Sequence, residues 1–383
     1  MFKKIGVLSL SIVTGAITAI TTIIPLILKH YPGISISRIE TLVTISSLSA
    51  LLTILFNNKL VEKFGLKKTI LSGLVIGMIA GVIPFFNNDY PVFFISRIIL
   101  GLGVGMYSPH AITLISILYK GSERANLLGV QMGVGAFGNS ILLFFSGWLA
   151  KMNWHYTFFT YLWLGIVALL VWLLVPEVHI DKIKDKKSTK SLSHSTIKYL
   201  ILSFVTFLII WGVQLKIPTF LYERGIVSSE KAGLILGVMN IAGMLAGLSF
   251  GLMYKKFKLF LLPIGFLLAA LSVFGMINSY SWMMIFIFAV LFNFVYSFTG
   301  PTIVLQVNQQ VEEYQLTKVN SLITMTTILS SYAAPIVWNN LSKIIDFKEG
   351  SVLVPMYIMI LSLFFCGLFL MCYTTYKLRY KGE

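Results

Sequence analysis

Residues 58–68 read NKLVEKFGLKK, a short basic connection between two apolar runs. A related pattern returns at residues 251–257, where GLMYKKF corresponds to NKLVEKF at residues 58–64, displaced by 193 positions. The same displacement relates Ile24-Pro25 to Ile217-Pro218. Because one offset serves both pairs, the chain is predicted to contain two similar halves.

The composition excludes a soluble globular protein. Of the 383 residues, 57% are hydrophobic and 11% are charged, against roughly 25% charged residues in a soluble domain. A bilayer crossing takes roughly 20 apolar residues, so this length holds about a dozen crossings and no separate catalytic domain. The runs are continuously apolar, which favours helices over the alternating strands of a membrane barrel.

Twelve membrane helices are predicted, with short polar connections between them. The first follows Lys3 and Lys4 and is too long for a secretory signal. The predicted fold is an all-α membrane protein with two pseudo-symmetric bundles of six helices. The expected spans are residues 5–29, 39–58, 67–87, 91–117, 123–150, 155–176, 197–222, 229–253, 259–278, 281–308, 316–341 and 350–376.

The basic residues indicate how the helices are oriented. In this arrangement 21 of the 30 Lys and Arg residues lie on the side that holds both termini, seven lie on the other side, and Arg97 and Lys216 fall within helices. Loops rich in Lys and Arg stay in the cytoplasm, so both termini are expected there and the chain in the cell membrane. The net charge of +16 reflects this topology and does not indicate nucleic-acid binding, which needs one clustered basic face.

The longest polar stretch, EVHIDKIKDKKSTKSLSHS at residues 177–195, divides the helices six and six. It predicts an N-terminal bundle at residues 1–176, a cytoplasmic linker at 177–196, and a C-terminal bundle with a short cytoplasmic tail at 197–383. Two similar bundles are what a transporter needs to expose one site alternately to each side of a membrane.

The connection at residues 58–68 resembles the signature loop of the major facilitator superfamily, G-x-x-x-D-(R/K)-x-G-x-(R/K)-(R/K). Glu62 stands where the family has Asp, and Asn58 replaces the first Gly. Gly65 permits a tight turn. An acid beside bases such as Lys63 can pair with a helix end and hold one conformation. Glu62, Lys63 and Gly65 are therefore candidate gating residues.

Two further motifs carry the same resemblance. RIILGLG at residues 97–103 is similar to the family's R-x-x-x-G-x-G helix, and WHYTF at residues 154–158 is similar to its W-R-x-x-F pattern, with His155 in place of Arg. Together they resemble a twelve-helix bacterial transporter, closest to the drug/proton antiporter branch, in which the matching arginine is associated with proton transfer. The exporter signature GP-x-x-GG is not matched, because Leu142-Leu143 and Ser146 occupy its Gly-Pro and first late Gly positions.

Ionisable residues inside helices are candidate functional residues, because a charge at the bilayer centre costs at least about 2.5 kcal/mol. Arg97 is assigned to coupling, to contact with an anionic substrate, or to structural bonds with helix-end carbonyls. Glu40 is interpreted as a solvated interfacial carboxylate paired with Arg38 or a loop, with proton coupling as the alternative. Lys216 is expected to snorkel to the interface rather than bind substrate. For His110, a neutral histidine bonded within the bundle is favoured over coupling.

Polar side chains at helical spacing form stripes that line a cavity or join helices. The first helix carries Ser11, Thr14, Thr18, Thr22 and Pro25, and the eleventh carries Asn320, Thr324, Thr327 and Ser331. In the family, helices 1, 4, 7 and 10 line the central cavity. This adds Tyr107, Trp211, Gln214, Asn293 and Tyr296 as candidates, and such aromatic residues would suit an amphipathic substrate.

Enzyme chemistry lacks its residues. The five histidines form no HExxH zinc motif, and no GxxxxGK(S/T) phosphate loop occurs. Cys366 and Cys372 lie along one helix, too far apart to form a disulfide. We therefore expect no enzyme activity, no cofactor and no metal, with transport driven by the gradient of an ion or of the substrate.

The functional prediction is secondary transport by alternating access, as proton-coupled export of a small amphipathic or drug-like compound. One alternative is an uptake permease or facilitator for a small organic solute or anion. The other is a membrane sensor that does not transport, which leaves the two-half architecture unexplained. The expected partners are a small-molecule substrate, protons or another coupling ion, and the lipid bilayer. Nucleic acid is not expected, and the chain is expected to be a monomer.

Overall fold

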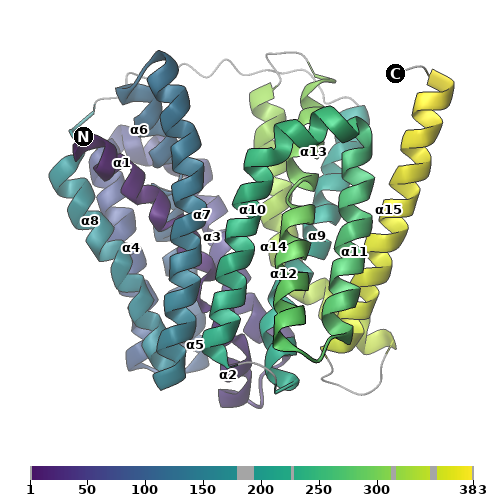
Figure 1. Cartoon of the computed structure of the whole chain (residues 1–383). Coiled ribbons are helices and arrows are strands. Elements are labelled where there is room, and N and C mark those ends of the chain that lie inside the picture. Colours follow the sequence, from purple (N-terminus) through teal and green to yellow (C-terminus); the bar gives the residue numbers. More distant parts are fainter. Residues whose placement is uncertain (1, 179–193, 226–227, 312–315, 346–351, 382–383) are drawn as a thin grey trace. The chain divides into compact units, whose positions relative to one another are not determined.

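The structure is a computed structural model, and it describes residues 2–178, 194–225, 228–311, 316–345 and 352–381. Every regular element in these ranges is helical (Figure 1). Eleven helical runs among them are long and apolar enough to cross a membrane. One run, Ser229–Asn278, is 50 residues long and contains two helices. The described ranges therefore hold twelve spans, which confirms the prediction of an all-α membrane fold.

The first six spans follow the predicted order closely. Their elements are α1 (Phe2–Ile12), η1 (Thr14–Ile23) and α2 (Ile24–His30) in the first span, then α3 (Ile36–Phe64), α4 (Leu66–Phe86), α5 (Tyr90–Tyr107) with α6 (His110–Leu118), α7 (Gly121–Met152), and η2 (Trp154–Tyr161) with α8 (Leu162–Leu174).

The last six spans are built in the same way. Their elements are α9 (His194–Glu223), α10 (Ser229–Phe257), the short η3 (Lys258–Phe260) leading into α11 (Leu261–Asn278), α12 (Trp282–Tyr296) with α13 (Thr299–Asn308), α14 (Leu316–Ile345) and α15 (Leu353–Lys381).

The chain folds into two compact units. Unit 1 comprises residues 1–185 with 228–237, and unit 2 comprises 186–227 with 238–383. In unit 1, η1 packs on α7 and α4 packs on α5; in unit 2, the corresponding elements α9 and α14, and α11 and α12, pack together. The same helix pairs thus form each core. Most of the predicted linker at 177–196 lies outside the described residues.

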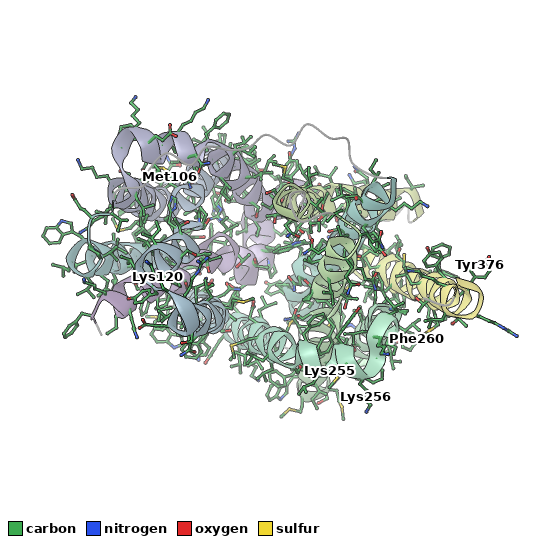
Figure 2. All side chains as sticks on the ribbon, turned by 90° about the horizontal axis from the view of Figure 1, so that it is seen from above. Met106, Lys120, Lys255, Lys256, Phe260 and Tyr376 are labelled. Atoms are coloured by element: carbon green, nitrogen blue, oxygen red, sulfur yellow. The ribbon has the colours of Figure 1, made fainter. Side chains whose placement is uncertain are left out.

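The repeat extends to the backbone of the short turns. Gly65 after α3 has φ +84°, and Lys258 after α10, 193 positions later, has φ +47°. Lys258 is the one non-glycine residue with positive φ in the described part of the chain. Figure 2 shows the neighbouring Lys255 and Lys256 beside Phe260 at this end of unit 2. Because a side chain is strained in this region, Lys258 occupies a position that favours glycine.

Lys258→Gly is therefore expected to stabilise unit 2. A single residue held in the left-handed region costs roughly 1 kcal/mol, which corresponds to a rise of about 2 °C in the midpoint of thermal unfolding. Lys256→Gly is the matched control, because a glycine within the last turn of α10 should lower the midpoint instead. Differential scanning fluorimetry in detergent measures both. A fall with Lys258→Gly would contradict the expected relief of strain.

Three spans are interrupted where continuous helices at 5–29, 91–117 and 281–308 were expected. The first contains η1, a ten-residue 3-10 helix. The fourth breaks at Ser108-Pro109 and the tenth at Ser297-Phe298. Hydropathy reports the length of a span and not its hydrogen-bond register, so these breaks were not predicted. Interrupted spans in corresponding positions of two halves are typical of the functional region of transporters.

Candidate functional site

Arg97 is the centre of the polar interior of unit 1. It lies on α5, is 1% exposed, and uses all three guanidinium nitrogens as donors. Nε donates to the Leu42 carbonyl of α3 at 3.0 Å, one Nη to the Tyr161 hydroxyl of η2 at 2.6 Å, and the other to the Ile17 carbonyl of η1 at 2.7 Å. One side chain therefore bonds to three other elements. The expectation of bonds to backbone carbonyls is met, although these carbonyls lie within η1 and the first turns of α3.

Glycines after Arg97 bring α5 against its neighbours. A Cβ atom on Gly101 would overlap the Ser46 carbonyl oxygen and the Ser49 hydroxyl of α3, and one on Gly103 would lie 2.7 Å from the Gly73 carbonyl oxygen of α4. The Ser46 hydroxyl also donates to the Arg97 carbonyl at 2.7 Å. Small residues thus let the backbones approach closely, which sets the position of the arginine.

Glu40 is buried, and the prediction of a solvated interfacial carboxylate was wrong. Its exposed fraction is 0%. Ile39, Leu42 and Val43 beside it are buried as well, so neighbouring elements surround this end of α3. Sequence position gives the depth of a residue along a span but not how fully that depth is enclosed. Arg97 bonds to α3 at Leu42, two residues after this carboxylate.

His110 begins α6, directly after the break in the fourth span. It is 6% exposed, and its Nε2 lies 3.1 Å from Asn57 Oδ1 of α3. The Asn57 amide also donates to the Gly105 carbonyl at 2.9 Å. The predicted histidine bonded within the bundle is thus present. Asn57 was not predicted, although Pro109 lacks an N–H and leaves a carbonyl in need of a donor.

The polar stripe of the first span is used mainly to join elements. Thr18 donates to Asn139 Oδ1 of α7 at 3.1 Å, and Thr22 lies 2.6 Å from the Ser146 hydroxyl of the same helix. Thr14 is half-buried and donates to the Ser11 carbonyl. Tyr107 of α5 donates to the Val13 carbonyl at 2.7 Å. Tyr107 and Thr22 are fully buried, so here they join helices and do not line an open cavity as expected.

Two candidates of unit 2 meet directly. Gln214 of α9 donates to Asn293 Oδ1 of α12 at 3.0 Å, and the Asn293 amide donates to the Met239 carbonyl of α10. Trp211 and Tyr296, the aromatic candidates on these two spans, are half-buried. The seventh and tenth spans are therefore linked by a polar pair whose members were singled out separately from the sequence.

Lys216 is buried, and the prediction that it snorkels to the interface was wrong. It is 2% exposed, and its Nζ donates to Asn339 Oδ1 of α14 at 2.7 Å. The Asn339 amide donates in turn to the Pro335 carbonyl at 2.6 Å, which directs its oxygen toward the lysine. Because α9 packs along α14, this face of α9 is enclosed at a depth from which an exposed lysine could reach the surface.

The polar stripe of the eleventh span bonds mostly to its own helix. Thr324, Thr327 and Ser331 donate to carbonyls three or four residues earlier, and Thr324 is exposed. Asn320 is half-buried, and its Oδ1 is buried without a hydrogen-bond partner. The contact between α14 and α9 is made instead by Thr326, whose hydroxyl lies 3.3 Å from that of Ser203. The stripe is thus left available for a ligand rather than for helix packing.

The signature loop forms the tight turn that was expected. Gly65 has φ +84° and ψ 155°, a conformation that is essentially restricted to glycine. Lys67 after the turn donates to the Trp172 carbonyl, near the C-terminal end of α8, at 2.8 Å, where a cation is favoured. Glu62 and Lys63 are exposed. The residue that contacts a helix end in this structure is therefore Lys67.

Gly65→Leu is expected to lower transport several-fold, because a leucine at this φ and ψ adds about 1–3 kcal/mol of strain to the turn. Gly33→Leu is the matched control: its loop has open space and no positive φ. Glu62→Gln should leave the unfolding midpoint unchanged, since the carboxylate is exposed, yet reduce transport if it latches another conformation. Transport per folded molecule, measured in proteoliposomes, checks all three. Equal rates in Glu62→Gln and the unmodified protein would reject the latch.

The W-H-x-x-F motif joins three connections of unit 1. The His155 ring lies 2.9 Å by Nδ1 from Asn153 Oδ1 and 2.7 Å by Nε2 from Asn88 Oδ1. Trp154 stacks on it with ring centroids 3.9 Å apart, and His30 at the end of α2 lies 5.8 Å away. The histidine that replaces the family's arginine therefore still acts as a link between connecting segments.

No group of three or more His, Cys, Asp or Glu side chains suited to a metal ion occurs in the described ranges. Two residues of the polar interior besides Asn57 were missed by the sequence analysis. Tyr161 lies three residues after Phe158 of the W-H-x-x-F motif, and Asn339 lies eight residues after Ser331. Both bond to a buried cation, so an uncompensated charge in a predicted span was the available signal.

Comparison with known proteins agrees with this architecture. Residues 6–335 match the Major Facilitator Superfamily, so the chain belongs to this superfamily. It is therefore a multi-pass membrane transporter and not an enzyme. Among solved structures it is similar to the nucleoside transporter NupG, with a TM-score of 0.76 over 97% of this chain and 99% of that chain at 13% identity. This likeness shows the fold alone.

Relatives of known sequence are more distant in length. A Protein TsgA homolog of Buchnera aphidicola subsp. Schizaphis graminum is 26% identical over 64% of this chain and 64% of its own. Multidrug transporter protein MdtP of Bacillus subtilis is 28% identical over 40% of this chain and 28% of its own. Quinolone resistance protein NorA of Staphylococcus aureus is 26% identical over 50% and 48%. In all three the match spans less than two thirds of the relative.

Proposed function

We propose that the protein exports small amphipathic compounds across the cell membrane in exchange for protons, with both termini in the cytoplasm. The observation that carries this proposal is the sequence similarity to MdtP and NorA, whose names identify a multidrug transporter and a quinolone resistance protein. The resemblance of the fourth span to the drug/proton antiporter branch supports it. Candidate contacts for the compound are the half-buried Trp211 and Tyr296 and the stripe of the eleventh span.

Coupling to protons is supported by the buried ionisable groups of unit 1. Glu40 and His110 are 0% and 6% exposed, and both side chains can exchange a proton. Arg97 cannot release its proton, but its bonds to α3, η1 and η2 connect the elements that carry these groups. Such residues within membrane spans are retained mainly for function.

A second candidate function is the transport of a small organic anion, favoured by the charges in the interior. Among the described residues, the fully charged side chains that are buried are Arg97 and Lys216, against one acid, Glu40. Two cations and one acid leave an excess of positive charge, which an anionic substrate would compensate. The two candidates differ in the sign of the transported compound.

Proteoliposomes with an acidic lumen test both candidates. A difference of about two pH units should drive accumulation of ethidium, an amphipathic cation, and an ionophore that collapses the pH difference should abolish it. Carboxyfluorescein, an impermeant anionic dye, tests the second candidate in the same vesicles, and protein-free liposomes are the control. Ethidium transport that ignores the pH gradient would defeat proton coupling. Movement of carboxyfluorescein without ethidium would favour the anion transporter.

A further inference from the structure

The break in the fourth span is repaired by a side chain from α3. Pro109 has no N–H, so the Gly105 carbonyl four residues earlier lacks its helical donor. Asn57 Nδ2 supplies that donor at 2.9 Å and lies 3.4 Å from the next carbonyl, that of Met106. In a membrane such freed carbonyls must be satisfied within the protein. The amide nitrogen of Asn57 is therefore committed to the backbone of α5.

This commitment sets the protonation of His110. With its nitrogen on the α5 carbonyls, Asn57 presents Oδ1 to His110 Nε2 at 3.1 Å. An amide oxygen only accepts, so Nε2 carries the hydrogen and donates it. In the neutral ring the other nitrogen, Nδ1, is then a bare lone pair.

Nδ1 of His110 is buried and has no hydrogen-bond partner among the described residues. The side chain is 6% exposed and lies eight residues before the end of the span at Leu118, about 12 Å along the helix. Buried polar atoms without a partner are rare and require an explanation. The one change that would occupy this lone pair without moving Asn57 is the gain of a proton or a water molecule.

The charged groups of the surrounding elements lie at helix ends. The elements against α6 are α1, α7 and, through Asn57, α3. Their charged residues near this end are exposed or half-exposed, and none bonds to the imidazole: Lys3, Lys4, Glu123, Arg124, Lys59, Glu62 and Lys63. The buried Tyr107 hydroxyl donates elsewhere, to Val13. No described acid thus stabilises an imidazolium in this conformation.

We propose that Nδ1 of His110 is the site that binds the transported proton. This inference rests on the proposed proton-coupled transport. The lone pair takes a proton from water, one N–H bond forms, and the ring becomes a cation while Nε2 keeps its hydrogen on Asn57. An imidazolium without a counter-charge is costly in an apolar interior, so protonation favours a conformation in which the break at Ser108-Pro109 is hydrated. The neutral ring favours the packed conformation, and a pH difference shifts the population between them.

The other buried ionisable groups of unit 1 are less suited to this role. The guanidinium of Arg97 never loses its proton in proteins, and all three of its nitrogens are occupied. Glu40 is five residues into α3, within about 8 Å of one end of its span, and stands in a continuous helix. His110 stands at a break, where a change of conformation can admit water. Glu40 is the rival that the experiment must separate.

Proton release on ethidium binding tests the assignment. The purified full-length protein in weakly buffered detergent solution receives ethidium at pH values between 5 and 8, and a pH-indicator dye reports protons released per molecule bound. The unmodified protein should release protons in the range where histidine titrates, near pH 6.5. His110→Gln keeps a donor for Asn57 but cannot gain a proton, so it should bind ethidium and release none. His30→Gln, at an exposed histidine, is the matched control and should release protons normally.

Asn57→Asp provides a second variant if His110→Gln fails to fold. A carboxylate beside the ring favours the charged form, so proton release should move upward by at least one pH unit. Nitrogen-15 spectra add a readout of the ring itself: the signal that His110→Gln removes should show the Nε2–H tautomer at pH 7.5 without ethidium.

The outcomes separate the two levels of the argument. Proton release by His110→Gln equal to that of the unmodified protein would overturn the assignment, as would its loss in Glu40→Gln with retention in His110→Gln. An Nδ1–H tautomer would overturn it as well. If the unmodified protein binds ethidium without releasing protons and its transport ignores the pH gradient, the proposed coupling fails, and the inference fails with it.

Discussion

Arg97→Met is expected to reduce gradient-driven transport at least 100-fold and to lower the midpoint of thermal unfolding by several degrees. The substitution removes three donors and leaves the carbonyls of Leu42 and Ile17 and the hydroxyl of Tyr161 without this partner. Hydrogen bonds within membrane proteins average about 0.6 kcal/mol, and unsatisfied buried groups cost about 1–3 kcal/mol each. The sum is roughly 2 kcal/mol or more.

Binding of ethidium in detergent separates the roles left for the arginine. If Arg97 acts in coupling, Arg97→Met should bind ethidium with nearly unchanged affinity while losing accumulation. If it contacts an anionic substrate, binding of that anion should weaken at least tenfold. Arg38→Met, at an exposed arginine of α3, is the matched control and should leave transport and the midpoint unchanged. Normal gradient-driven transport by Arg97→Met would show that the three contacts are dispensable.

Gly101→Val is expected to prevent most of the chain from folding. The new Cβ atom would overlap the Ser46 carbonyl oxygen and the Ser49 hydroxyl, and a backbone atom cannot move aside as a flexible side chain can. Overpacking of this kind costs typically 1–3 kcal/mol and occasionally more. It also displaces α5, and with it Arg97. The measurement is the fraction of monodisperse protein in size-exclusion chromatography, together with the unfolding midpoint.

Gly129→Val is the control for this substitution. Gly129 lies within α7, and a Cβ there would meet nothing within 4 Å. Both variants place the same β-branched residue in a helix, so the cost in helix propensity is the same. The difference between them therefore isolates the contact with α3. A similar folded fraction in the two variants would mean that α3 and α5 can separate at little cost.

The membrane helices could be predicted from the sequence because each is a continuous apolar run of the right length. The span expected at 67–87 is observed as Leu66–Phe86. Hydrogen-bond register inside a run leaves little trace in hydropathy, so the 3-10 helix η1 was missed. Pro109 was a usable signal for the break in the fourth span, because proline removes one helical hydrogen bond.

The candidate site was predicted less completely than the fold. Arg97 and His110 were found because polar groups in a span stand out against apolar neighbours. The burial of Glu40 and Lys216 could not be predicted, since it depends on how neighbouring elements enclose each helix end. Asn57 and Asn339 were missed for a related reason: each is an ordinary polar residue until a particular ring or ammonium group faces it. Helix packing, rather than residue type, decides these partners.

The 3-10 helix in the first span implies a built-in change of length. A 3-10 helix rises about 2.0 Å per residue and an α-helix about 1.5 Å, so the ten residues of η1 extend about 20 Å now and would extend about 15 Å as α-helix. Conversion would draw α1 toward α2 by about 5 Å and rotate one against the other by roughly half a turn. The carbonyls of Val13, Ile17 and Ala19, held by Tyr107, Arg97 and Ser146, would have to be released first. The first span can thus work as a ratchet whose stroke is set by these three bonds.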